Sequence, residues 1–542
     1  MLSQKTSSMS TKRSYWGWGN ADFVFPAAIL DKYKGMLRNL LQVDQLDAIE
    51  PLPVADLQLR PPRFALPAEL ESICSATNYD RAGHSYGKSF RDVWRGLHGY
   101  FPHPPDYVAF PRTEEDVRQL MQFARAEQIA LIPYGGGSSV CGGVEATDDP
   151  NYQGTISVDL QHFNELLDID HTSRSAHLQG GMYGPAIEAA LKPHGVTLRH
   201  YPQSFEFSTL GGWIATRSGG HFATLYTHID EFVQSIRMVT PEGIIQTRRL
   251  PGHGAGPGEE RLYAGSEGTL GIITSAWMRL QSIPQHKRTV AVNFPGFKAG
   301  AEAARALAQS GLYPSNARLI DTMEAFTNGL GDGQSAVLLV GFESHQHPVE
   351  PWLQEALNIC QEYDGTWETP SKPEKVSSSR SDTWKQSFLL APYLRDELLK
   401  LGVIVETFET AITWDQYPAF YKAVKKAAQA ALQEQCGFGL ITCRFTHIYP
   451  DGPAPYFTVI APGKKDRQLE QWDAIKATVS QAIVDHGGTI THHHAVGRDH
   501  LPYYQQQHTP LFGKLLASAK KTVDPEWVLN PGVLLSRHDD RK

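Results

Sequence analysis

The sequence predicts an α+β protein of two or three domains. The chain has 542 residues, 41% of them hydrophobic and 20% charged, which is an ordinary globular composition but too long for one hydrophobic core. Short apolar or alternating segments, typical of strands, are interrupted by helical stripes. Longer helical patterns become frequent after Ile283 and Pro284, so we expect a second domain to begin there.

The first of these domains is expected over residues 101–284. It opens with a strand at Tyr107–Phe110, and Thr113 then offers an N-cap for a helix with the apolar stripe Val117, Leu120, Met121 and Ala124. A second strand follows at Ile129–Pro133, and another helix begins near Pro185. The remaining expected strands are Thr155–Leu160, Ala176–Gln179, Ile236–Thr240, Ile244–Arg248 and Gly271–Leu280.

The second domain is expected over residues 285–490, with helices and strands interleaved. The helices include Ala301–Gln309 and Pro418–Glu434, and the strands include Ala336–Phe342, Gly402–Thr407 and Tyr456–Ile460. The polar stretch Ser371–Asp382 is expected to be a mobile loop. Residues 1–100 form a helical or irregular N-terminal segment, and residues 491–542 form a C-terminal segment.

Three glycine-rich clusters lie inside the first domain. PYGGGSSV (Pro133–Val140) follows a strand directly, and its glycines and hydroxyls suit a pyrophosphate. It is neither the usual dinucleotide fingerprint nor a P-loop, and alone it also fits a tight turn. SFEFSTLGGWIATRSGG (Ser204–Gly220) and GSEGTLGII (Gly265–Ile273) are the other two. Together the clusters indicate a long cofactor that the backbone approaches at several points.

Three consecutive histidines, His492, His493 and His494, follow the turn at Gly487-Gly488. If Thr489–His494 is extended, alternation places His493 on the opposite face from its two neighbours. The three imidazoles would then not converge on one metal ion, so no metal site is expected. By themselves the histidines fit an exposed polar strand end as well as a functional cluster.

Charge and cysteine content narrow the class of protein. A formal net charge of -8 argues against a nucleic-acid partner. The five scattered cysteines form no C-x-x-C pair, which favours a reducing compartment over a disulfide framework or a zinc site. We find no signal-peptide core in residues 1–14, no transmembrane stretch and no Ser-Lys-Leu type tail at Asp540-Arg541-Lys542. A cytoplasmic protein is expected, with peripheral membrane contact left open.

The glycine clusters, together with HIDEFV and SIRMVTPEG (His228–Gly243), resemble the FAD-binding module of the vanillyl-alcohol oxidase superfamily. The chain is most similar to the alkyldihydroxyacetonephosphate synthase family. More specific segments carry that resemblance: WGWG (16–19), RAGHSYGKSFRDVW (81–94), SNARLID (315–321), PYLRDELL (392–399), ETFETAITWD (406–415), TCRFTHIY (442–449) and THHHAVG (491–497).

The resemblance implies a fold and an activity. The fold is a PCMH-type FAD-binding domain of two α+β subdomains plus an α+β cap domain with an antiparallel sheet, to whose flavin site residues 491–542 return. The activity replaces the acyl chain of acyl-dihydroxyacetone phosphate by a long-chain alcohol, which gives an ether without net redox change. The resemblance makes Tyr456 the catalytic tyrosine, His493 the general base with His492 and His494 placing it, Arg318 a further arginine needed for activity, and Arg444 the substrate-binding arginine.

The resemblance also implies FAD as a cofactor, bound non-covalently. Backbone amides of the first glycine loop would face the pyrophosphate, and Ser208, Thr209 and Thr216 could hydrogen-bond the ribityl chain or the ring. The full set of implied cofactor-binding residues is Pro133, Tyr134, Gly135, Gly136, Gly137, Ser138, Ser139, Val140, Gln203, Ser204, Ser208, Thr209, Gly212, Thr216, Ser218, Gly219, His221, Phe222, Glu267, Gly268, Thr269, Leu270, Gly271 and Ile273.

The chain departs from the family pattern at three places. Ala325–Gln334 is short and glycine-rich where animal members have a longer apolar insert, Gln203 replaces an acidic residue, and Ala495 replaces a glycine. An FAD-dependent dehydrogenase or oxidase of a 2-hydroxy acid shares the same architecture and is the alternative activity. The family further implies a lipid substrate and a homodimer.

Overall fold

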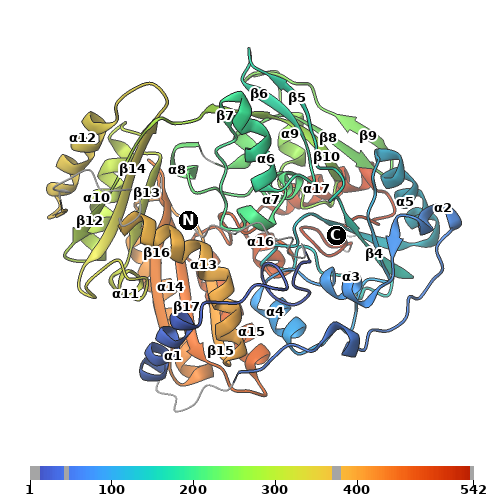
Figure 1. Cartoon of the computed structure of the whole chain (residues 1–542), viewed down its shortest axis with the longest axis horizontal. Coiled ribbons are helices and arrows are strands. Elements are labelled where there is room, and N and C mark those ends of the chain that lie inside the picture. The colour runs from blue at the N-terminus through green and yellow to red at the C-terminus, as the bar shows by residue number, and fades with distance from the viewer. Residues whose placement is uncertain (1–11, 42–47, 227, 369–379, 538–542) are drawn as a thin grey trace.

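The chain forms two differently built halves (Figure 1). Residues of both halves line one cavity. The structure is a computed structural model that describes residues 12–41, 48–226, 228–368 and 380–537. Two sheets of four and five strands lie on the right of Figure 1, and a six-stranded sheet lies on the left. Helices cover these sheets, so the predicted α+β class is confirmed, whereas the residue bounds of the domains stay a prediction.

The first sheet has the order β1-β2-β4-β3 and contains the strand–helix–strand unit predicted from the sequence. Strands β2 and β3 run parallel to β4, and β1 is antiparallel to β2. Thr113 caps the helix α5 in a capping box, and the predicted apolar stripe of α5 is buried on this sheet. The elements are β1 (Cys74–Ser75), β2 (Tyr107–Ala109), α5 (Glu114–Glu127), β3 (Ile129–Tyr134) and β4 (Gly154–Asp159).

The second sheet is antiparallel in the order β5-β6-β10-β8-β9, and its helices carry the second glycine cluster. Its strands are β5 (Leu166–Asp170), β6 (Ser175–Gln179), β8 (Val233–Thr240), β9 (Gly243–Gln246) and β10 (Ile272–Arg279). The short pair β7 (Val196–Thr197) and β11 (Gln281–Ser282) lies beside it. The helices are α6 (Gly184–Leu191), α7 (Leu210–Thr216), α8 (Ala223–Tyr226) and α9 (Glu259–Tyr263).

The third sheet is antiparallel in the order β12-β14-β13-β16-β17-β15. One face is packed by α10, α12, α14 and α15 into the largest apolar core, while the opposite face lines the cavity. Its strands are β12 (His286–Phe294), β13 (Asn316–Ile320), β14 (Ala336–Ser344), β15 (Val403–Glu409), β16 (Leu440–Ile448) and β17 (Pro453–Pro462). The helices are α10 (Phe297–Gln309), α11 (Thr322–Thr327), α12 (Glu350–Gln361), α14 (Tyr417–Cys436) and α15 (Gln468–Asp485).

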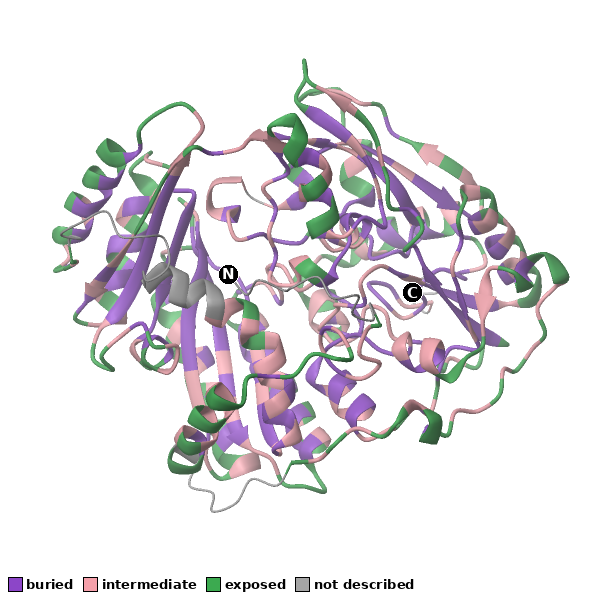
Figure 2. Ribbon diagram, viewed as in Figure 1, coloured by how far each residue is buried: buried purple, intermediate pink, exposed green. Residues whose placement is uncertain are grey.

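Alternation along these strands separates the two faces. Ala317, Cys443 and Phe457 point into the apolar core, whereas their neighbours Arg318 and Arg444 line the cavity. Figure 2 shows the same strands as largely buried, because helices cover one side and the other half of the molecule covers the other. The polar residues of this sheet are therefore held in a water-poor space.

The N-terminal and C-terminal segments of the chain both contact the sheets and helices described above. The N-terminal segment forms α1 (Ala27–Leu41), α2 (Ala68–Glu71), α3 (Asn78–Gly83) and α4 (Phe90–Leu97). The C-terminal segment forms α16 (Leu501–Gln507) and α17 (Pro510–Val523), then pairs with β3 through a bridge between Leu131 and Leu529. This return anchors the histidine segment against the first sheet.

One predicted loop is partly wrong. Most of Ser371–Asp382 lies outside the described residues, but its last three positions belong to α13 (Arg380–Lys400). A polar composition alone did not reveal that the helix starts this early. By contrast, the glycine- and proline-rich loop at Pro251–Gly258 is almost entirely exposed.

Candidate active site

One cavity brings together the predicted cofactor and catalytic residues. Two glycine clusters form one wall, and the six-stranded sheet with the histidine segment forms the other. The predicted residues that line this cavity are Gly135, Gly136, Gly137, Ser138, Ser139, Val140, Gln203, Ser204, Ser208, Thr209, Gly212, Thr216, Ser218, Gly219, His221, Arg318, Arg444, Tyr456, His493 and His494.

The first glycine loop packs so tightly against the second that side chains have no room. A Cβ atom on Gly136 would lie 1.9 Å from the carbonyl oxygen of Phe207, and one on Gly135 would lie 2.3 Å from Oγ1 of Thr209. Gly137 has a φ of +66°, in the left-handed region that favours glycine. The glycines are therefore required by the contact between the two loops, and the backbone itself forms this wall.

The hydroxyls predicted to contact the cofactor also shape the start of α7. Ser208 Oγ accepts a hydrogen bond from Trp213 Nε1 at 2.6 Å. Thr209 is the N-cap of α7, and Thr216 Oγ1 donates to the carbonyl of Gly212 at 2.8 Å. These bonds hold the three residues in the cavity lining. Ser208 Oγ also donates to the carbonyl of Ser204 at 2.8 Å, so its hydroxyl is already engaged within the protein.

Other predicted cofactor residues lie behind the wall. Pro133, Tyr134, Phe222 and the third glycine cluster are absent from the cavity lining, so a direct contact with FAD stays a prediction for them. Gly268 lies against Pro133, which a Cβ atom would approach to 2.8 Å. The set behind the wall is completed by Glu267, Thr269, Leu270, Gly271 and Ile273, all of which are buried.

Within that cluster, Glu267 connects the glycine wall to the histidine segment. Its carboxylate accepts hydrogen bonds from the backbone amides of Val496 and Gly497, both at 2.8 Å. Burial raises the pKa of Glu267 to about 7, although these two amides favour the ionised form. The Gly-Ser-Glu-Gly cluster is thus a structural support of the site in this fold.

Two arginines approach the cavity from neighbouring strands. Arg318 on β13 is 1% exposed, and burial together with the charge of Arg444 lowers its pKa to about 9. Arg444 on β16 donates from Nη1 to Glu324 Oε1 at 2.5 Å. Burial alone would lower the pKa of Arg444, but the Glu324 carboxylate reverses the effect and raises it. The pair supplies a buried positive field suited to an anion.

Tyr456 lies beside Arg444 because the two residues are directly paired between β16 and β17. The guanidinium carbon of Arg444 is 3.8 Å from the centroid of the Tyr456 ring. Burial raises the pKa of Tyr456, and Arg444 opposes that effect by favouring the phenolate. The phenol is therefore protonated at rest and next to a cation that stabilises its anion.

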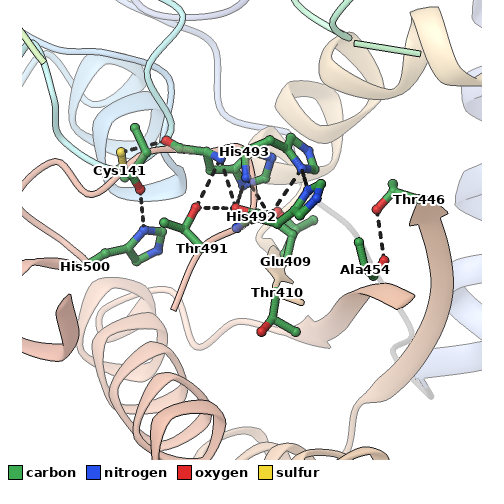
Figure 3. Close-up of polar contacts among 12 residues, drawn as sticks. Cys141, Glu409, Thr410, Thr446, Ala454, Thr491, His492, His493 and His500 are labelled. Atoms are coloured by element: carbon green, nitrogen blue, oxygen red, sulfur yellow. Dashed lines mark hydrogen bonds and ion pairs between the residues drawn. The ribbon is translucent and has the colours of Figure 1, made fainter. Parts of the chain in front are cut away.

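The histidine segment is bent, so the condition of an extended Thr489–His494, which placed His493 on the opposite face, does not hold. Glu409, a residue that the sequence did not single out, accepts hydrogen bonds from the backbone amides of all three histidines (Figure 3). These bonds compete with strand pairing for the same backbone donors. As a result, His493 and His494 both reach the cavity, while His492 lies behind them.

Behind this bend the rings of His447 and His492 meet His493. Their ring nitrogens lie within 4.8 Å of one another, close enough to hold a metal ion, so the geometric reason for expecting no metal site fails. Nε2 of His447 contacts the carbonyl of Gly220 at 2.9 Å, and Nε2 of His492 contacts the hydroxyl of Tyr449 at 2.9 Å. The second contact gives His492 a protein partner on its outer side.

His447 was missed because a β-bulge carries it to the cavity. The pairing of β16 with β17 shifts register between Phe445 and His447. Thr446 and His447 therefore both line the cavity, although adjacent strand residues normally point to opposite faces. Burial and the neighbouring His492 hold the pKa of His447 well below its usual range, so the ring is neutral.

The donor set of the cavity fits FAD. Backbone amides and hydroxyls of the glycine wall suit the phosphates and the ribityl chain, while the sheet wall presents cations and neutral imidazoles to a polar ring. Residues 105–248 match the family model described as FAD binding domain, and residues 283–534 match FAD linked oxidases, C-terminal domain.

Comparison with known proteins defines the family more closely. The chain is 30% identical to an alkyldihydroxyacetonephosphate synthase of Dictyostelium discoideum over 527 residues, which covers 90% of this chain and 84% of the relative. The chain belongs to the alkyldihydroxyacetonephosphate synthase family. A member from Trypanosoma brucei brucei is 28% identical over 483 residues, 84% of this chain and 77% of the relative. A solved alkyldihydroxyacetonephosphate synthase structure superposes with a TM-score of 0.80 at 27% identity, covering 95% of this chain and 98% of that one.

FAD is therefore the cofactor of this family member, and the fold is the predicted PCMH-type fold. Non-covalent binding remains an expectation, which denaturing the flavin-loaded protein would test. A covalent bond to flavin would need a cysteine or histidine side chain, and Cys141, His228 and His221 lie near the glycine clusters in the sequence. Cys141 does not line the cavity, and burial raises the pKa of its thiol well above the usual value. His228 is occupied by a contact to His492 at 3.2 Å, and His221 lines the cavity.

Proposed function

We propose that this protein replaces the acyl chain of acyl-dihydroxyacetone phosphate by a long-chain alcohol, producing an ether and a fatty acid without net redox change. The similarity to alkyldihydroxyacetonephosphate synthases supports this assignment. The observation that carries it is a single cavity lined by both glycine loops and by Arg318, Arg444, Tyr456 and His493. Such a reaction requires an anion clamp and a proton acceptor in one site.

The two arginines would bind the anionic substrate. A phosphate or a departing carboxylate has the geometry for a paired interaction with a guanidinium. Arg444 is held in place by Glu324, and Arg318 has its cationic charge in a buried position, where an anion is bound more strongly than in water. The arginine pair therefore fixes the substrate before any proton moves.

FAD, when bound, would supply an electron-accepting ring system to the reaction. Tyr456 is placed to exchange a proton with the dihydroxyacetone unit, because its phenol is protonated at rest and Arg444 stabilises the anion. His493 is placed to accept the proton of the incoming alcohol. His494 lies beside it, and burial lowers the pKa of His494 to about 3, so that ring is neutral.

The alkyl chain would lie along an apolar strip of the cavity. Phe388, Ala391 and Pro392 on α13 line the cavity together with Val405 on β15. These residues offer a route for a long chain although Ala325–Gln334 is short. Among the described residues no helix is long and apolar enough to cross a membrane. Peripheral membrane contact and a homodimer are part of this proposal.

The decisive experiment uses the purified, FAD-loaded protein with acyl-dihydroxyacetone phosphate and a long-chain alcohol. Mass spectrometry should detect the alkyl ether and an equal amount of released fatty acid. Absence of both products with intact flavin would reject the synthase assignment. Reduction of the flavin by a 2-hydroxy acid would then support the dehydrogenase or oxidase alternative.

A further inference from the structure

Glu409 ends β15 and lies opposite Tyr456 in the register of β15 with β17. Directly opposed residues of antiparallel strands point to the same face of a sheet, so the Glu409 side chain lies on the catalytic face. The residue is 3% exposed. Glu409 belongs to the ETFETA motif, and the family resemblance alone assigned no role to this motif.

Four hydrogen-bond donors to the Glu409 carboxylate come from the histidine bend, Thr491–His494 (Figure 3). Oε2 accepts from the backbone amides of His492 at 2.6 Å and His493 at 2.9 Å. Oε1 accepts from the amide of His494 at 2.9 Å and from the hydroxyl of Thr491. One buried anion thus fixes the backbone of three consecutive residues and the side chain of Thr491.

The same carboxylate also contacts an imidazole. Nδ1 of His493 is 3.2 Å from Oε2 of Glu409 and 3.0 Å from Nδ1 of His492. A proton on Nδ1 of His493 satisfies both contacts, because the carboxylate only accepts hydrogen bonds when ionised. Nε2 of His493 is then the ring nitrogen that carries a lone pair.

We propose that Glu409 is the positioning residue for His493, fixing the bend that carries this imidazole and the tautomer in which Nε2 accepts the proton of the alcohol. This inference rests on the proposed function, in which the alcohol O–H bond breaks and its proton moves to Nε2. The alcohol oxygen then forms the ether bond to the dihydroxyacetone carbon, and the bond from that carbon to the acyl carboxylate breaks, so that the fatty acid leaves. The resulting imidazolium is stabilised by the adjacent anion at Nδ1.

The charge of Glu409 is retained although the carboxylate is buried. Burial alone would raise its pKa, but the imidazoles of His493 and His494 hold it well below the usual range. The other titratable groups facing His493 are Tyr456 on β17, His447 on β16, and His492 and His228 on its outer side. Glu409 is the anion nearest to this ring among the described residues.

Glu406, three residues earlier, shows what a supporting glutamate does on the same strand. Its carboxylate accepts from Nε1 of Trp472 and from Nζ of Lys476 at 3.2 Å, tying β15 to α15. Among the described residues, the hydrogen-bond partners of Glu406 lie on β15 and α15 and not in the histidine bend. The two glutamates of the motif therefore have different roles. Glu406 holds α15 against β15, whereas Glu409 holds the imidazole of His493.

The test compares Glu409→Gln, which keeps the shape and removes the charge, with Glu409→Asp, which keeps the charge. For Glu409→Gln we expect kcat for ether formation to fall about 100-fold with little change in KM. The acid limb of the pH profile of kcat/KM should move to lower pH, because the imidazolium has lost its anion. Glu409→Asp should restore the position of that limb.

Asp524→Asn is the matched control, because Asp524 is a buried carboxylate that accepts two backbone amides at Val528 and Leu529 far from the cavity lining. It should lower the melting temperature and leave the acid limb in place. The proposal is overturned if Glu409→Gln behaves in the same way, with activity lost only in proportion to FAD content or folded protein.

A second readout does not require activity. Nitrogen-15 NMR of histidine-labelled protein reports the tautomer of His493, whose signal is assigned by its loss in His493→Gln. The wild-type protein should show Nδ1–H, and Glu409→Gln should lose this preference; an identical tautomer in both would overturn the proposal. If wild-type protein makes no ether but the tautomer changes as expected, the proposed function fails while the positioning role stands.

Discussion

The two walls of the cavity are built from different parts of the chain. The glycine wall uses backbone, and its small residues are required because the loops at Gly136 and Phe207 touch each other. The sheet wall uses side chains, with Arg318, Arg444 and Tyr456 on alternate positions of β13, β16 and β17. Substitution of a glycine by a larger residue should therefore disrupt the glycine wall. Loss of a charged or hydroxyl group should instead disrupt the sheet wall.

The walls also differ in how they handle charge. The sheet wall carries the buried cations Arg318 and Arg444. Glu324 pairs with Arg444, and the Glu409 carboxylate lies against the His493 ring. The lining of the glycine wall contributes amides and hydroxyls with almost no ionisable side chains. This contrast suggests that cofactor binding and chemistry can be separated by mutation, since each depends mainly on one wall.

The largest effect is expected from Tyr456→Phe on the sheet wall. Loss of the hydroxyl removes a proton exchange group, so ether formation should fall about 10²–10⁴-fold. FAD content should stay the same, because Tyr456 faces the arginines and belongs to the opposite wall from the glycine loops. Steady-state kinetics together with the flavin absorbance of the purified variant measures both quantities.

Tyr417→Phe is the matched control for that variant. Tyr417 is a buried tyrosine that packs into the apolar core on the other face of the same sheet. Its ether-forming activity should equal that of the wild-type protein. Equal activity losses in the two variants would mean that Tyr456 acts only through packing.

A smaller but distinct effect is expected from Gly136→Ala on the glycine wall. The added Cβ atom meets the backbone oxygen of Phe207 at 1.9 Å, so the two loops must separate. We expect a loss of about 3 kcal/mol in stability and a weaker hold on FAD. Thermal melting and flavin content measure these changes.

Gly252→Ala provides the control for the glycine wall. Gly252 lies in an exposed loop, and a Cβ atom there would meet no atom within 4 Å. Its melting temperature and flavin content should match the wild-type values. If Gly136→Ala also matched them, the close packing of the two loops would not be needed for cofactor binding.

Much of this contrast could be predicted from sequence patterns with local causes. The apolar stripe of α5 and the strand at Tyr456–Ile460, which lies within β17, each follow from the geometry of a helix or strand, and each is confirmed. The glycine clusters could be recognised as loops that approach one another or a ligand. Which clusters line the cavity could not be predicted from the sequence. Gly265–Ile273 resembles the other two clusters in composition, but it packs behind the cavity wall.

The shape of the histidine bend could not be predicted from a local sequence pattern. Its shape depends on Glu409, which is more than eighty residues away in the sequence, and the position of His447 depends on a β-bulge. Neither a long-range hydrogen bond nor a register shift leaves a periodic signal. Extended alternation was therefore the simplest expectation for Thr489–His494, and tertiary contacts override it.

The smallest effect concerns the buried histidines behind the sheet wall. Burial and the neighbouring His493 lower the pKa of His228 from 6.5 to about 4 in the folded protein. Because the unfolded chain binds a proton first, folding stability is complete above pH 6.5 and falls as the pH decreases toward 4. At pH 5.5 this one group should lower the free energy of unfolding by about 1.4 kcal/mol.

The melting temperature of His228→Gln should therefore fall less between pH 7 and pH 5.5 than that of the wild-type protein. The melting temperature of the control variant His253→Gln, which lies in an exposed loop, should fall as much as that of the wild-type protein. An unchanged acid sensitivity in His228→Gln would show that His228 titrates freely and that this side of the wall is open to water.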